Sequence, residues 1–256
     1  MEIGVVGTAL LLTFFAGIST GIGGLTPYFI KKPKTIYLSL GLGFAGGVMI
    51  YISFMELLPE AFEDAGEGIA VLSFFLGIIM LGIIDFLIPE KETYDLSSII
   101  DEDEEEKNKL FATSKLTAYA IAGHNFPEGM VTFFTALVDI RLGVIIGIAI
   151  AIHNIPEGVA VAIPYYYATG DKFKAFLHSL GAGLAEPVGA LVAFLILWNF
   201  LTPALIVTML AFVAGIMVYI SFDELLPLAH DYDSSHSAIL GIVLGMLVMA
   251  VTLLIV

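Results

Sequence analysis

Two copies of one hexapeptide carry side chains that could bind a metal cation. The first copy, HNFPEG, spans residues 124–129, and the second, HNIPEG, spans residues 153–158. Residues four apart on a helix share a face, so each copy presents an imidazole and a carboxylate to one point, with the asparagine amide on an adjoining face. The candidate ligands are His124, Asn125, Glu128, His153, Asn154 and Glu157.

The types of these side chains indicate which cations they would hold. The chain contains no cysteine, so the set combines imidazole nitrogens with carboxylate and amide oxygens and includes no thiolate. Such a set suits Zn²⁺, Fe²⁺, Mn²⁺, Co²⁺ or Cd²⁺ better than Cu⁺, Mg²⁺ or Ca²⁺. We expect a divalent metal site of broad selectivity, with zinc foremost.

The elements that must position these residues are membrane-spanning helices. The chain has 256 residues, of which 59% are hydrophobic and 14% charged, whereas a soluble domain is roughly 45–50% apolar. An apolar run of about 20 residues spans the hydrocarbon core as a helix. The sequence therefore predicts an all-α polytopic membrane protein, a single transmembrane domain over 1–256. The eight apolar runs lie near 3–30, 36–58, 68–89, 115–138, 142–164, 178–200, 203–228 and 236–256.

The spans repeat with inverted orientation. Residues 47–59 match residues 215–227 at a constant offset of 168, and these segments lie in the second and seventh spans. The two hexapeptides match at an offset of 29 and lie in the fourth and fifth spans. Spans separated by an odd number of crossings run antiparallel, so the sequence predicts an inverted 3+2+3 repeat. Transporters built in this way place their binding site near the membrane midplane, at the repeat interface.

Carboxylates at this depth need a compensating charge. Each costs about 2.5–3.5 kcal/mol at mid-bilayer, so Glu128 and Glu157 together cost roughly 5–7 kcal/mol if nothing neutralises them. No Lys or Arg lies close to either residue in its span, which points to a metal cation or to protons. Glu186, beside Pro187 in the sixth span, is a further expected ligand. His178 lies eight residues earlier on roughly the same face, and its role is open.

The basic residues predict the orientation of the spans. With eight alternating spans, all nine lysines fall on one side and Arg141 alone falls on the other. The positive-inside rule makes the lysine side cytoplasmic and puts both termini outside. The segment 90–114 contains six consecutive carboxylates, 101–106, and is expected to be an acidic, disordered cytoplasmic loop. The net charge of −15 disfavours a nucleic-acid partner.

The double hexapeptide, the Glu-Pro pair at 186–187 and the eight-span plan resemble the ZIP (Zrt/Irt-like protein) family over nearly the whole chain. The resemblance implies uptake of divalent metal into the cytoplasm, a multi-pass protein of a bacterial or archaeal cell membrane, and a homodimer. It also implies that the first, fourth, fifth and sixth spans move as a unit against the others. One departure is that many eukaryotic members carry a histidine-rich loop where this chain has the acidic segment.

The same resemblance implies a binuclear site between the fourth, fifth and sixth spans. One metal would bind His124, Glu128, His153 and Glu157. The other would bind Asn125, Asn154 and Glu186, with Glu128 and Glu157 bridging the two metals.

Two other functions stay open at this point. An intramembrane zinc-dependent hydrolase could use the same ligands, but the chain lacks an HExxH motif and an obvious Ser or Cys nucleophile beside the hexapeptides. A cation channel could use the same carboxylates. We expect a transporter and not an enzyme, with the metal as cargo rather than as a prosthetic group.

Overall fold

The computed structural model describes residues 3–30, 34–87, 104–200, 202–233 and 236–254. Every element within these residues is helical, which confirms the predicted all-α class. The eight predicted spans correspond, in chain order, to α1 (Ile3–Gly24) with α2 (Thr26–Phe29); α3 (Thr35–Ile52) with η1 (Ser53–Leu57) and α4 (Leu58–Ala65); α5 (Glu67–Leu87); α6 (Glu104–Val138); α7 (Ile140–Thr169); α8 (Lys172–Gly183) with α9 (Ala185–Leu197) and η3 (Trp198–Phe200); α10 (Pro203–Ile220) with η4 (Ser221–Leu225) and α11 (Leu226–Tyr232); and α12 (Ser237–Leu254).

Seven of these units are long and apolar enough to cross a membrane by length and composition. The remaining unit, α6, has the length but carries His124, Asn125 and Glu128 as well as a charged first part. Its partner in the repeat, α7, reaches the required hydropathy. The chain is therefore a multi-pass membrane protein, while its orientation in the bilayer stays a prediction.

The predicted acidic loop at 90–114 differs from the structure in part. Residues 90–103 lie outside the described residues, whereas 104–114 form the beginning of α6 and not a loop. In residues 104–114 three glutamates and two lysines, both strong helix formers, make up almost half of the sequence. Local propensity therefore starts the helix about two to three turns before the apolar run begins.

The turn between α7 and α8 shows how the long helices end. Gly170 closes α7 in a left-handed conformation, with φ of 69° and its N–H bonded to the Tyr166 carbonyl. Asp171 then caps α8 by accepting a hydrogen bond from the backbone N–H of Lys174 at 3.0 Å. That hydrogen bond lowers the pKa of the exposed Asp171 carboxyl. The reversal holds α7 and α8 side by side and antiparallel.

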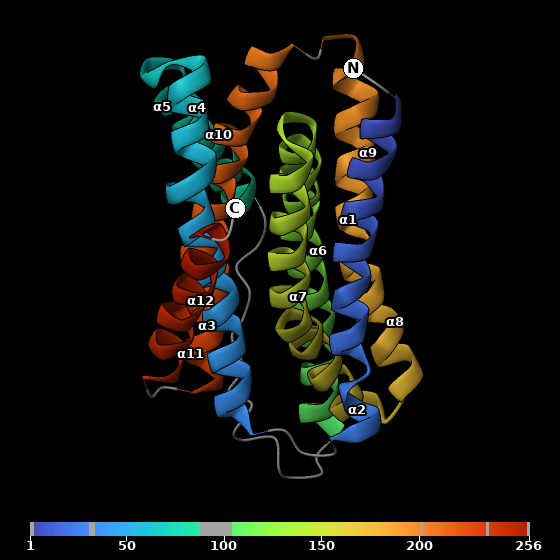
Figure 1. Ribbon diagram of the computed structural model, residues 1–256. Helices are drawn as coiled ribbons and strands as arrows, with labels where there is room; N and C mark the ends of the chain where they lie inside the picture. The colour runs from blue at the N-terminus through green and yellow to red at the C-terminus, as the bar shows by residue number, and fades with distance from the viewer. Residues whose placement is uncertain (1–2, 31–33, 88–103, 201, 234–235, 255–256) are drawn as a thin grey trace.

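The helices form two groups, which Figure 1 shows on opposite sides of the molecule. In one group α1 packs on α7, and α6 packs on both α7 and α9. In the other, α3 packs on α12 and α5 packs on α10. The two groups meet where α3 contacts α7 and where α10 contacts α6. We call them the α1/α6/α7/α9 group and the α3/α5/α10/α12 group.

The packing follows the predicted inverted repeat. The α3–α12 contact in one half corresponds to the α5–α10 contact in the other. Gly47 of α3 lies against the Ile242 carbonyl, and Gly215 of α10 lies against the Phe74 carbonyl. Both pairs of positions are related by the offset of 168. Glycine permits such close approach because it has no Cβ, so the duplicated glycines fix the same helix separation twice.

The second and seventh spans also share a local irregularity. Each changes from α-helix to a π-helical turn, at Ser53–Leu57 and at Ser221–Leu225. The hydroxyl of Ser53 donates to the Met49 carbonyl at 2.7 Å, and the hydroxyl of Ser221 donates to the Met217 carbonyl at 2.8 Å. π-helical turns are rare in proteins, and those that occur are often found at functional sites. Their presence at both equivalent places therefore argues for a shared structural role.

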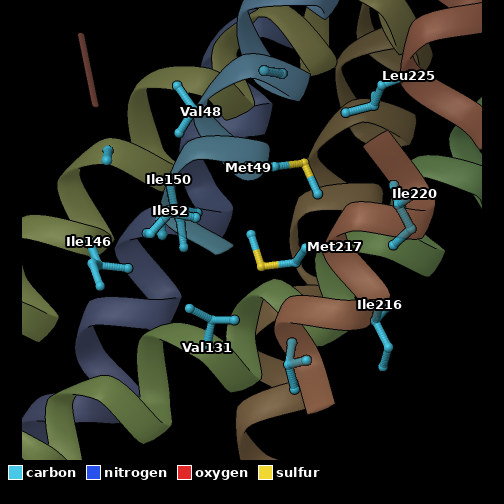
Figure 2. Packing of buried hydrophobic residues seen from close by; sticks show 14 of the residues in the cluster. Val48, Met49, Ile52, Val131, Ile146, Ile150, Ile216, Met217, Ile220 and Leu225 are labelled. Carbon is cyan, nitrogen blue, oxygen red and sulfur yellow. The ribbon is translucent and has the colours of Figure 1, made fainter. Parts of the chain in front are cut away.

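Buried apolar side chains of both groups belong to one core. Figure 2 shows Met49 of α3 and Met217 of α10, which occupy equivalent positions in the repeat, pointing toward each other. Val131 of α6 and Ile150 of α7, from the other group, belong to the same core cluster. Ile52 and Ile220 also occupy equivalent positions. All of these side chains are buried. The core that the two groups share is therefore apolar at these positions.

Candidate metal centre

The two hexapeptides lie within the helices α6 and α7, which pack against each other. Both helices continue through their internal prolines, Pro127 and Pro156. All seven predicted ligands are buried, and only His124 has any exposed fraction, at 2%. They are His124, Asn125 and Glu128 on α6, His153, Asn154 and Glu157 on α7, and Glu186 on α9.

The histidines pair with carboxylates across the helix interface. His124 Nε2 lies 3.3 Å from Glu157 Oε2, and His153 Nε2 lies 3.3 Å from Glu128 Oε1. The two distances are equal because the pseudo-twofold axis exchanges one pair for the other. Ligand atoms of Glu128, His153 and Glu157 all lie within 4.8 Å of one another, a separation that one metal ion can bridge. The fourth member, His124, lies next to Glu157 at the edge of this cluster.

The asparagines are held by backbone carbonyls of the flanking helices. The Nδ2 of Asn125 donates to the Ala182 carbonyl at 3.2 Å, and the Nδ2 of Asn154 donates to the Ala16 carbonyl at 3.1 Å. Because each amide nitrogen is committed to a carbonyl, each Oδ1 is directed elsewhere as an acceptor. In the described part of the chain neither Oδ1 has a hydrogen-bond partner. Two amide oxygens are thus available to a cation.

Glu186 joins the cluster through an asparagine. The Nδ2 of Asn154 also donates to Glu186 Oε1, which fixes this carboxylate beside α7. Its second oxygen, Oε2, is buried and accepts no hydrogen bond from the described residues. Close packing of α6 on α9 brings Glu186 to the cluster. Gly129 of α6 lies against the Glu186 carbonyl, and a side chain at position 129 would force the two helices apart.

The chemistry of this cluster is that of an anionic cavity in an apolar protein. Glu128, Glu157 and Glu186 are fully buried, and no Lys or Arg occurs between Lys115 and Arg141 or between Arg141 and Lys172. Buried carboxylates are costly unless they are paired or bind a metal. The buried side-chain atoms that make no hydrogen bond to a described residue are His124 Nδ1 and Nε2, Asn125 Oδ1, Glu128 Oε2, His153 Nδ1, Asn154 Oδ1, Glu157 Oε1 and Oε2, and Glu186 Oε2. His124 Nε2 and Glu157 Oε2 among them make the ion-pair contact described above.

The structure separates His178 from this cluster. The His178 ring stacks on Tyr165, with centroids 4.1 Å apart, and its Nδ1 lies 2.9 Å from the Lys174 carbonyl. The ring is half-buried on α8. These contacts explain its position without a metal. His230 on α11 is exposed and lies outside the hexapeptide helices.

Sequence analysis missed a polar residue of α1. Thr20 is fully buried, and α1 packs on both α7 and α6. The signal was present: residues 17–23 read GxxTxxG, and residues 183–189 in the sixth span read GxxExxG with Glu186 at the centre. Aligning the first and sixth spans on these glycines, at an offset of 166, would have paired Thr20 with Glu186.

Comparison with known proteins agrees with this architecture. The family model described as ZIP Zinc transporter matches residues 89–253. Curated relatives named Zinc transporter ZupT include one from Akkermansia muciniphila, 47% identical over 95% of this chain and 96% of its own length, and one from Streptococcus mutans, 46% identical over 96% and 97%. A third, from Chlorobium phaeovibrioides, is 49% identical over 96% and 97%. The chain belongs to the ZIP family of zinc transporters.

Proposed function

We propose that this chain carries Zn²⁺ across the cell membrane into the cytoplasm through the cluster between α6, α7 and α9. The observation that carries the proposal is the reciprocal pairing of His124 with Glu157 and of His153 with Glu128, each at 3.3 Å. Nitrogen and oxygen donors at that spacing match the needs of a divalent cation, and the sequence has no Lys or Arg at 116–140 or 142–171 to neutralise the carboxylates. The names of the curated relatives support zinc as the cargo.

The proposed site holds two cations. The buried donor atoms without a hydrogen-bond partner among the described residues form two sets, the nitrogens of the histidines and the oxygens of Asn125, Asn154 and Glu186. We assign one metal to each set, with Glu128 and Glu157 bridging the two metals. Because the ligands mix nitrogen with oxygen and include no thiolate, the proposal extends to Fe²⁺, Mn²⁺, Co²⁺ and Cd²⁺.

The proposed mechanism is alternating access. A bound cation neutralises the carboxylates, and the α1/α6/α7/α9 group, which holds every proposed ligand, then shifts against the α3/α5/α10/α12 group. The apolar core that the groups share, with Met49 and Met217 on one side and Val131 and Ile150 on the other, supports such sliding because apolar side chains can change neighbours without breaking hydrogen bonds. We place both termini outside, on the lysine distribution, and propose a homodimer on the family resemblance.

Uptake of radioactive zinc by proteoliposomes containing the purified full chain tests this function. We expect uptake that saturates with zinc concentration and that is inhibited by Co²⁺ or Cd²⁺. Empty liposomes provide the background. Flux that rises linearly with concentration and does not saturate would favour the channel, and zinc-dependent cleavage of a peptide substrate would favour the hydrolase. Crosslinking of the chain in native membranes tests the homodimer.

A further inference from the structure

The symmetry of the centre is broken at one position of α1. Three separate contacts relate α1 to the α8–α9 span at the offset of 166. Asn154 bonds the Ala16 carbonyl as Asn125 bonds the Ala182 carbonyl. The other two pairs of contacts come from glycines that lie against a backbone carbonyl oxygen. Gly23 lies against the Ile155 carbonyl, as Gly189 lies against the Phe126 carbonyl. Gly158 lies against the Thr20 carbonyl, as Gly129 lies against the Glu186 carbonyl.

These relationships make Thr20 the equivalent of Glu186. The axis that exchanges α6 with α7 maps the contact between Asn154 and Glu186 onto Asn125 and Thr20. One half of the centre therefore has a carboxylate where the other half has a hydroxyl. Threonine is shorter than glutamate, so at the equivalent place its hydroxyl reaches less far from α1 than the carboxylate reaches from α9.

The Thr20 hydroxyl itself lacks a normal partner. Helical threonines usually bond a carbonyl one turn earlier. In the described part of the chain six do so at 2.6–3.0 Å: Thr8, Thr13, Thr26, Thr169, Thr208 and Thr252. Thr20, Thr132 and Thr135 are buried without a hydrogen-bond partner among the described residues. For Thr20 the carbonyl four residues earlier is that of Ala16, which receives the Asn154 amide. Thr20 Oγ1 is fully buried and has no hydrogen-bond partner within the described ranges. The amide oxygen of Asn125 is likewise buried and has no hydrogen-bond partner among the described residues.

The residue is nevertheless held firmly in place. The Ser179 hydroxyl donates to the Thr20 carbonyl at 2.7 Å, which ties α1 to α8. Gly158 lies against the same carbonyl from α7, and Gly183 lies against the Thr20 side chain. The backbone of Thr20 is thus fixed by α7 and α8, and its buried hydroxyl, which has no hydrogen-bond partner among the described residues, is suited to bind a ligand.

We propose that Thr20 is an eighth residue of the metal centre, whose hydroxyl binds the transported cation on the Asn125 side. This inference rests on the proposed function and adds a specificity-determining residue to it. A neutral hydroxyl in place of a second Glu186-type carboxylate leaves three carboxylates in the centre instead of four. Two divalent cations then carry four positive charges against three negative ones, which weakens retention and favours release.

The test uses purified full-length chain and Zn²⁺, with equilibrium dialysis for affinity and proteoliposomes for uptake. Thr20→Val keeps the shape and removes the oxygen, and we expect roughly tenfold weaker zinc binding and a similar loss of uptake at low zinc concentration. Thr20→Ser retains the hydroxyl and should bind within about twofold of the native chain. Thr13→Val is the matched control, because Thr13 is equally buried on α1 but bonds the Leu10 carbonyl.

Exchange of the two residues gives a second, independent test. Glu186→Thr alone should lose zinc binding, and the double variant Thr20→Glu with Glu186→Thr should recover part of it, since the carboxylate returns to the equivalent position. Native-level binding by Thr20→Val, or a defect in Thr20→Ser as large as that in Thr20→Val, would overturn the proposal. So would a double variant that binds no better than Glu186→Thr. Failure of the native chain to bind or carry zinc would instead refute the proposed function.

Discussion

His124 of α6 pairs with Glu157 of α7 across the helix interface, with His124 Nε2 3.3 Å from Glu157 Oε2. Within its own hexapeptide, however, His124 shares a helical face with Glu128, and Glu157 shares one with His153. The centre is therefore a property of the helix pair and not of either helix alone. Loss of one side chain on α6 leaves a donor on α7 without its neighbour, which makes substitutions in either helix informative.

Substitution of the paired residues should remove transport without unfolding the chain. His124→Ala and Glu157→Gln each delete one donor of the centre, and we expect zinc uptake by proteoliposomes to fall by about a hundredfold or more. His178→Ala is the control, since His178 stacks on Tyr165 away from the centre and its loss should leave uptake within about twofold. Normal uptake by His124→Ala would remove this residue from the site.

Zinc binding should release protons and weaken in acid. Imidazoles and carboxyls bind metal only after deprotonation, so protons compete with zinc for His124, His153 and the three buried glutamates. Calorimetry at about pH 7.5 in two buffers of different ionisation enthalpy should yield a proton release above zero, and the dissociation constant should rise as the pH is lowered toward about 5.5. A dissociation constant that does not change over this interval would argue that the histidines are not ligands.

The close packing of α7 on α1 should be sensitive to a single methyl group. Gly158→Ala places a Cβ against the Thr20 carbonyl, a backbone atom that cannot move by changing rotamer. We expect a loss of about 1–3 kcal/mol in stability, measured as a lower melting temperature in detergent, together with reduced uptake. Gly181→Ala is the control. A Cβ there meets no atom within 4 Å, so this change should be neutral or stabilising by up to about 1 kcal/mol.

Cysteine labelling tests the inverted repeat and the orientation together. Glu63 and Asp231 are both exposed and occupy equivalent positions at the offset of 168, and the chain has no native cysteine. A membrane-impermeant thiol reagent added to intact cells should label Glu63→Cys and spare Asp231→Cys. The pattern should reverse in inside-out vesicles. Labelling of both positions from one side would contradict the antiparallel arrangement of the second and seventh spans.

Much of the fold could be read from the sequence because a bilayer imposes simple rules. Every backbone group must be bonded within its own segment, so apolar runs of sufficient length become helices, and eight such runs gave the correct class. The first span ends at Phe29 and the seventh unit begins at Pro203, close to the predicted limits. The beginning of α6 at Glu104 was missed, since that part of the helix follows from propensity and not from hydropathy.

The sequence by itself also determined the chemistry of the centre, through two identical ligand patterns at helical spacing and a repeat that places them at one axis. Only the tertiary structure decided the pairing of His124 with Glu157, the commitment of Asn125 and Asn154 to the Ala182 and Ala16 carbonyls, and the burial of Thr20. Spacing along one helix fixes which residues share a face. The rotation of that helix, and the distance to its neighbours that glycines such as Gly158 permit, decide what the face meets.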